Sequence, residues 1–192
     1  ANGRDQSGAF SASSWIHFYW IWDGTTLATV SSTVAPPTGP TLPTGYTHWS
    51  YICALRYNAT PLLIATRLRG TAVYYNDAAV TGVLLSNGSA TVETAIDTSA
   101  LVPPNASSVV LIAIISSTNT TAANQLNVRT ITTLTQWNPI VSIAEASGIT
   151  QTWANAGGLL PNIAQNLYYL LTQTGGGAYI NCIGFHNPNG AS

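Results

Sequence analysis

The stretch WIHFYWIW, residues 15–22, carries bulky apolar side chains at both odd and even positions. Trp, Ile, Phe and Tyr fit the pleated surface of a β-sheet, and successive side chains of a strand point to opposite faces. A strand that is bulky on both faces cannot lie on a sheet with one face in water. We therefore expect a central strand here, with its second face covered within the subunit or by another subunit.

On the C-terminal side of this stretch, apolar runs of strand length alternate with turn residues at the spacing expected of a sandwich or barrel. The runs are rich in Val, Ile, Thr, Tyr and Trp. The pattern predicts an all-β fold, a jelly-roll-like antiparallel β-sandwich, with less than about 10% helix. The expected strands besides 15–22 are residues 27–34, 48–57, 62–69, 72–75, 80–85, 91–96, 108–115, 126–134, 140–144, 167–172 and 178–185.

Two local signals refine this pattern. Asn87-Gly88 is the clearest signal for a two-residue hairpin turn, because both residues accept positive φ. Residues 162–171 leave room for at most a short helix after Pro161.

Length and apolar content favour one domain. A chain of 192 residues with 46% hydrophobic residues can bury a sizeable core, and a β-sandwich can reach about 200–250 residues without dividing. We expect a single β-sandwich domain over residues 1–192. Because the chain opens on ANGR and contains no Met, we also expect it to be part of a longer or processed chain.

Charged residues are scarce, at 6% of the chain against about 25% in an ordinary soluble protein. Lys is absent, so Ser, Thr and Asn must carry most of the interaction of the surface with water. Hydroxyl and amide groups respond little to salt, because little of that interaction is Coulombic. This composition suits a protein that works outside a cell.

Several partner classes are disfavoured. The net charge of the chain is −1, and the sequence lacks the clustered Lys and Arg that binding to a phosphate backbone requires. We therefore expect no nucleic-acid partner. The most apolar stretch, residues 109–115, is too short to span a membrane, so we expect no membrane insertion. His17, His48 and His186 lack the spacing of metal ligands, so we expect no metal or other cofactor.

An enzyme would have to draw its acid and base from six acidic residues. Glu93 and Asp97 share one face of an expected strand but would stand about 13 Å apart, too far for a glycosidase pair. We assign no catalytic residue and expect no enzyme. A polysaccharide depolymerase with acids on different strands is the less favoured alternative. The six residues are Asp5, Asp23, Asp77, Glu93, Asp97 and Glu145.

Aromatic residues are the best candidates for ligand contact. The chain has six Trp and nine Tyr, whose apolar faces and polar tips suit sugar rings and protein surfaces. Those at expected strand ends or in loops are open to a ligand. Packing in the core is the competing interpretation for each. The candidate ligand-binding residues are Tyr74, Tyr75, Asp77, Trp137 and Trp153.

Three residues with reactive or titratable side chains lie in apolar strand contexts. We expect His17 to be a packed imidazole with one hydrogen-bond partner. Cys53 and Cys182 can pack as small hydrophobes. Whether these two cysteines form a disulfide stays open at this point.

Several motifs in order along the chain are similar to those of a known module. Residues 15–22 are followed by a short turn, a Leu-Pro-x-Gly-Tyr-Thr turn and a Val-Pro-Pro turn before an apolar strand. The sequence resembles, over roughly residues 3–115, a β-sandwich module near the C-terminal ends of bacteriophage tail-fibre, tail-spike and related virion proteins. The quoted segments are Gly3-Arg4-Asp5-Gln6, Asp23-Gly24-Thr25-Thr26, Pro40-Thr41-Leu42-Pro43-Thr44-Gly45-Tyr46-Thr47, Leu101-Val102-Pro103-Pro104 and residues 109–115.

The resemblance implies a virion protein that acts outside the cell. Such modules attach to a glycan or protein of the host surface, or cap a fibre among other virion proteins, and they are commonly trimeric. The function expected from it is therefore host attachment, with a structural capsid or fibre-capping role as the alternative. The resemblance carries over no catalytic residue.

Composition independently favours a homo-oligomer. With 6% charged residues, the chain has few charges to keep exposed sheet edges apart. A closed symmetric assembly would cover them, and we expect it to bury one face of residues 15–22 or a neighbouring apolar strand. A trimer is implied only by the resemblance. In the alternative, a second sheet or a loop layer covers that strand within one subunit.

Overall fold

The computed structural model describes residues 3–76, 82–117, 124–129, 138–143, 149–160 and 165–188. Throughout these ranges the regular structure is β-strand, with no helix. Nearly all neighbouring strands pair antiparallel, the exception being β1 with β3. The predicted all-β antiparallel sandwich is confirmed.

The N-terminal part forms one four-stranded sheet, which we call the N-terminal sheet. Its order is β1 (Gly3–Arg4), β3 (Leu27–Ser32), β2 (Ser14–Trp22) and β4 (His48–Tyr57). The aromatic strand β2 pairs with β3 on one side and with β4 on the other. It is therefore a central strand of its sheet, as expected.

The rest of the chain forms two further sheets, which we call the sandwich. The smaller runs β11 (Asn138–Ile143), β10 (Asn124–Arg129), β13 (Asn166–Leu171) and β8 (Thr94–Asp97). The larger runs β12 (Ile149–Leu160), β9 (Ser108–Ser117), β14 (Gly176–His186), β6 (Ala72–Tyr75) and β5 (Thr66–Arg69), and β7 (Val83–Gly88) also pairs with β14. Their facing side chains form the main core, which includes Val109, Leu126, Leu171 and Ile180.

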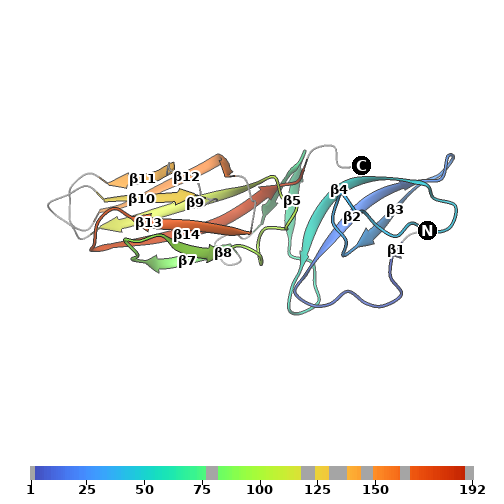
Figure 1. Ribbon diagram of the computed structural model, residues 1–192, viewed down its shortest axis with the longest axis horizontal. Helices are drawn as coiled ribbons and strands as arrows, with labels where there is room; N and C mark the ends of the chain where they lie inside the picture. Colours follow the sequence, from blue (N-terminus) through green and yellow to red (C-terminus); the bar gives the residue numbers. More distant parts are fainter. Residues whose placement is uncertain are drawn as a thin grey trace.

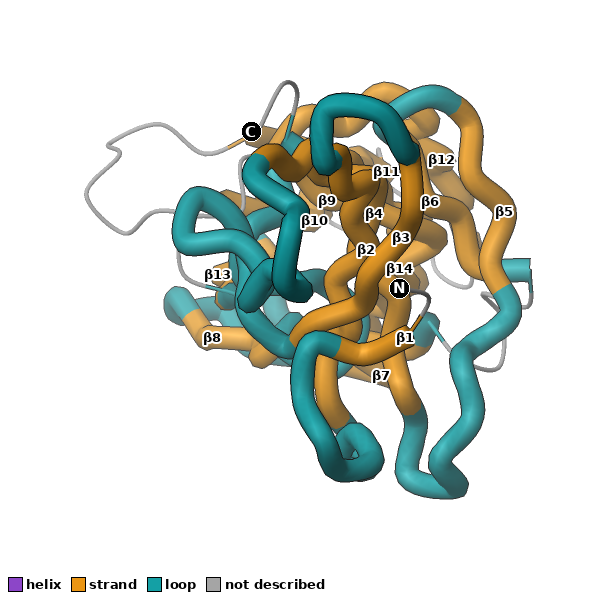
Figure 2. Tube along the Cα trace, turned by 90° about the vertical axis from the view of Figure 1, so that its right-hand side faces the viewer, coloured by secondary structure: helices purple, strands orange, loops and turns teal. Residues whose placement is uncertain are grey.

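The molecule is elongated, with the N-terminal sheet at one end and the sandwich at the other (Figure 1). The hairpin of β5 and β6 lies where the two parts meet. Figure 2 looks along the long axis from the end that carries the N-terminal sheet, with β2 and β3 in front of the sandwich strands.

Strand β2 changes its surroundings along its length. Trp15 packs edge-on against Phe185 of β14 with ring centroids 5.6 Å apart, and its indole N–H donates to the carbonyl of Ser99 at 2.9 Å. Phe18 also packs against the main core. The first half of β2 therefore anchors the N-terminal sheet to the sandwich.

The second half of β2 is covered on one face only. Tyr19 and Ile21 are buried beneath the loop that precedes β4, where Leu42 and Tyr46 pack against them. The loop comes so close that a Cβ on Gly39 would lie 2.5 Å from the Trp49 ring. For this face the alternative interpretation applies, in which a loop layer covers the strand within one subunit.

A buried polar cluster also joins the two parts. His17 Nδ1 lies 3.3 Å from the Tyr51 hydroxyl, which donates to the side-chain oxygen of Asn187 at 3.3 Å. The same oxygen accepts from the backbone N–H of Ala54, and the Asn187 amide nitrogen donates to the carbonyl of Thr71, each at 3.3 Å. The expected packed imidazole at position 17 is confirmed.

One local turn prediction was wrong, and one strand was missed. Asn87 has a φ of 54°, as its type allows, but Gly88 pairs with Ala178 at the end of β7. The chain then leaves for β8 in the other sheet, so no two-residue hairpin forms. The strand predicted over residues 167–172 is confirmed as β13 (Asn166–Leu171), whereas strand β12 was not predicted at all.

The two cysteines are both buried free thiols in the main core. Burial raises the pKa of Cys53 to about 11 and that of Cys182 to about 12. They act as small apolar side chains, which was one of the two open interpretations.

Candidate functional site

The structure treats the five candidate ligand residues differently. Asp77 and Trp137 lie outside the described residues. Trp153 lies in β12, where its backbone is in register with Ala113 of β9. Tyr74 and Tyr75 follow one another in β6 and face opposite sides of the sheet.

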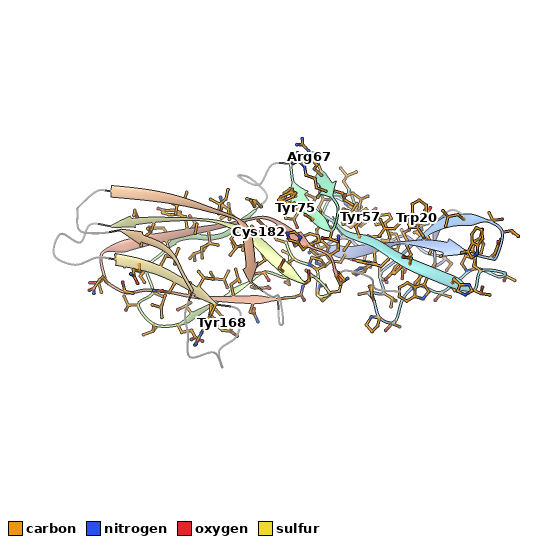
Figure 3. The ribbon with its side chains drawn as sticks, turned by 90° about the horizontal axis from the view of Figure 1, so that it is seen from above. Trp20, Tyr57, Arg67, Tyr75, Tyr168 and Cys182 are labelled. Carbon is orange, nitrogen blue, oxygen red and sulfur yellow. The ribbon has the colours of Figure 1, made fainter. Side chains whose placement is uncertain are left out.

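Tyr75 is taken up by the core. It is buried, its hydroxyl donates to the carbonyl of Leu101, and its ring centroid lies 6.3 Å from that of Phe185. Burial raises the pKa of this hydroxyl well above its ordinary value. In Figure 3 it points into the molecule near Cys182. Its side chain is therefore occupied by packing.

Tyr74 is half-buried and faces a groove of about 520 Å³ at the β5–β6 hairpin. In the hairpin register Arg67 stands directly opposite Tyr74, and Arg69 lies two residues further along β5 on the same face. We call this site the arginine groove. Its lining residues are Arg67, Arg69, Tyr74, Tyr75 and Asn76.

The arginines of the groove differ from the others in the chain. Arg129 forms an ion pair with Glu93, while Arg4 and Arg56 lie over the rings of Phe10 and Trp15. Arg67 and Arg69 are exposed, and within the described residues their guanidinium groups form no hydrogen bond or ion pair. Figure 3 shows Arg67 directed away from the body of the molecule. The groove therefore presents two available positive charges.

Neither arginine was predicted from the sequence as a site residue. The available signal was the triplet Arg67-Leu68-Arg69, because residues two apart in a strand share one face. In a chain with only five Lys and Arg, two on one face of a four-residue strand are a local concentration of charge. Their proximity to Tyr74 depends on the hairpin register, which the sequence did not show.

A second candidate surface lies on the open face of the N-terminal sheet. Trp20 is 45% exposed, Trp22 38% and Leu27 59%. The register places Trp20 beside Ser50 and Trp22 between Leu27 and His48. We call Trp20, Trp22, Leu27, His48 and Ser50 the tryptophan face. A hollow of about 140 Å³ lies among them.

The described acidic residues are engaged in local structure. Asp23 accepts hydrogen bonds from the backbone N–H groups of Thr25 at 2.8 Å and Thr26 at 2.6 Å, which lower its pKa. Asp97 likewise accepts from Ser99, with the same direction of pKa shift. Asp5 accepts from the backbone of Thr41 at 3.1 Å, and Glu93 has its ion pair. Asp77 and Glu145 lie outside the described residues.

Metal-binding and membrane-spanning features were also sought. In the described ranges no three His, Cys, Asp or Glu side chains gather as they would around a metal ion. Those same residues include no helix of the length and apolarity needed to cross a membrane. Among the residues that the structure describes, the arginine groove and the tryptophan face are two candidate surfaces for a partner.

No protein-family model matches the chain, and no curated protein matches it in sequence.

Proposed function

We propose that this chain is an attachment module of a bacteriophage virion, which binds a glycan or protein on the host surface and catalyses no reaction. The observation that carries the proposal is the arginine groove, an open site with a half-buried tyrosine and two guanidinium groups that have no partner among the described residues. A groove of about 520 Å³ has the size of small-molecule binding sites. The motif order described above supports the virion context.

The state of the acidic residues favours binding over hydrolysis. A glycosidase needs two carboxyl groups that face one substrate bond. Asp23 and Asp97 instead hold turns, and Glu93 neutralises Arg129. None of these three residues lines the arginine groove.

The test of attachment uses the purified chain and a panel of bacterial cells, with their extracted lipopolysaccharides and capsular polysaccharides. We expect saturable binding to at least one envelope preparation, without release of reducing ends. Release of reducing ends that disappears when one of the six acids is replaced would contradict the proposal in favour of a depolymerase. Incorporation into particles without envelope binding would favour a structural role.

We further propose that the chain forms a homo-oligomer through the tryptophan face. Two half-exposed Trp and an exposed Leu side by side are costly to leave in water, since apolar burial contributes roughly 25 cal/mol per Å². A second copy of the chain has the matching apolar surface, and a closed arrangement avoids open-ended growth. That the oligomer is a trimer is implied only by the resemblance to bacteriophage tail proteins.

Sedimentation at micromolar concentration tests the oligomer. We expect a mass that is a multiple of the 20.1 kDa of one chain and that falls to one chain in the variant Trp20→Ser/Trp22→Ser. The control is Val92→Ser, which removes a side chain that is 71% exposed in the sandwich. A wild-type mass of one chain at every concentration would exclude this assembly and leave the attachment test unaffected.

A further inference from the structure

We infer that the arginine groove binds a carboxylate-bearing saccharide, such as a uronic-acid or sialic-acid unit of an envelope polysaccharide. This inference rests on the proposed attachment function and names the ligand chemistry of the site. It starts from the two guanidinium groups that have no partner within the described residues.

The hairpin sets the geometry of these groups. Arg67 and Arg69 lie on one face of β5, so their Cα atoms are about 7 Å apart. A guanidinium has donors in a planar fork that matches a carboxylate in a bidentate manner. Two guanidinium groups at this spacing can bind one carboxylate each. Alternatively, one can bind a carboxylate while the other donates to hydroxyl oxygens of the neighbouring sugar.

Tyr74 and Asn76 supply the contacts that a sugar ring needs. Tyr74 stands opposite Arg67 in the hairpin, half-buried, with a flat apolar face. Asn76 lies two residues beyond Tyr74 and lines the same groove. Its amide both donates and accepts hydrogen bonds, as sugar hydroxyls do. Cationic, aromatic and amide groups together fit an acidic sugar better than a neutral one.

The charge of the chain argues against larger anions. Nucleic acid binds through many phosphate contacts, and its affinity depends on the number of cations that meet them. The groove offers two arginines, in a chain whose net charge is −1. A short acidic segment of a saccharide is the ligand of matching charge and size.

A different role for these arginines would also explain their position. Strand β5 ends the larger sheet, and charged side chains on an edge strand prevent edge-to-edge pairing of sheets. That role requires no ligand. It predicts that removal of the arginines causes self-association while saccharide binding is unchanged, so the two roles differ in what is measured.

The experiment is calorimetric titration of the wild-type chain with oligosaccharides of galacturonate, glucuronate, mannuronate and sialate, each paired with its carboxyl-reduced form. We expect at least one acidic oligosaccharide to bind at least about tenfold more tightly than its reduced partner, because hydrogen bonds to charged groups contribute about 1.5–3 kcal/mol. The variant Arg67→Gln/Arg69→Gln should lose at least about tenfold in affinity. Its thermal unfolding should match that of wild type, because both side chains are exposed.

The matched control is Arg4→Gln, which removes an exposed positive charge from the N-terminal sheet. Unchanged affinity in Arg4→Gln supports the site. The inference would be overturned by equal binding of the reduced oligosaccharides, by equal loss in Arg4→Gln, or by full binding by Arg67→Gln/Arg69→Gln. If the wild-type chain binds cells or neutral glycans but no acidic oligosaccharide, the inference is wrong and attachment stands. If it binds no envelope material either, attachment is wrong as well.

Discussion

The N-terminal sheet and the sandwich bury their apolar surface in different ways. In the sandwich two sheets face each other and enclose a main core that reaches from Ala178 and Ile180 to Phe185. The N-terminal sheet has no partner sheet among the described strands. It covers one face with its own loop over Tyr19 and Ile21, and leaves Trp20 exposed on the other.

The difference shows how a single sheet can be stable at the end of a sandwich. The first half of β2 shares the main core through Trp15 and Phe18, so the N-terminal sheet does not depend on its small cluster alone. The second half extends past the sandwich, and its outward side chains lie on an open surface. Stability is therefore expected to concentrate at the junction, while the free end remains available for a partner.

The largest effect is expected from the ring that joins the N-terminal sheet to the sandwich. Phe185 is fully buried and contacts Trp15 of the N-terminal sheet and Tyr75 of the sandwich. Phe185→Ala should lower the free energy of unfolding by about 3–5 kcal/mol, because it removes apolar contacts and leaves a cavity. Urea denaturation measures this. The control is Val92→Ala at an exposed position, which should lower the free energy of unfolding by less than about 0.5 kcal/mol. A loss below about 1 kcal/mol in Phe185→Ala would contradict the shared core.

The next effect is a pH dependence that belongs to the N-terminal sheet. Burial lowers the pKa of His17 from 6.5 to about 4. Between these values the unfolded chain binds a proton that the folded chain does not, so stability falls as pH falls from 6.5 to 4, by about 3 kcal/mol in total. The free energy of unfolding, measured between pH 6.5 and 4, should fall with pH in wild type and fall less steeply in His17→Gln.

This pH window separates His17 from the turn carboxylates. The pKa values of Asp23 and Asp97 are lowered from 3.8, so their stabilising contribution is present above that value and is lost only at lower pH. An equal slope in wild type and His17→Gln between pH 4 and 6.5 would show that the buried imidazole does not control the acid response.

A smaller effect is expected from the polar cluster at the junction. Asn187 is buried and joins Tyr51 and Ala54 of β4 to Thr71. Asn187→Ala leaves the Ala54 N–H without its acceptor, which should cost about 1–3 kcal/mol. Hydrogen exchange should show faster opening of β4 than of β9. Uniform acceleration in both strands would mean that the two parts unfold only as one unit.

The smallest effect on stability is expected on the tryptophan face. Trp20→Ser, measured at a dilution where the chain is a single copy, should lower the free energy of unfolding by about 1 kcal/mol, since about half of the side chain is already exposed. Tyr19→Ala, its neighbour on the covered face, should cost about 3–5 kcal/mol. Similar losses in the two variants would show that both faces of β2 are buried within one subunit.

The sequence by itself determined the fold class and many of the strands. The strand over residues 48–57 and the strand over residues 72–75 were predicted with the bounds they have in β4 and β6. These segments carry dense β-branched and aromatic residues between clear turn signals. The central position of β2 in its sheet was also expected from residues 15–22. Within one subunit, however, its second face is left partly exposed at Trp20 and Trp22.

Only the tertiary structure decided which strands belong to which sheet and where the arginine groove lies. Asn87 took the expected positive φ, but the local turn signal could not say that β7 and β8 belong to different sheets. Tyr74 and Tyr75 are equivalent as sequence, yet strand alternation leaves the Tyr74 side chain half-exposed at the groove and buries the Tyr75 side chain in the core, where it reaches only the groove wall. Arg67 faces Tyr74 only through the hairpin register, and register depends on contacts between residues that are distant along the chain.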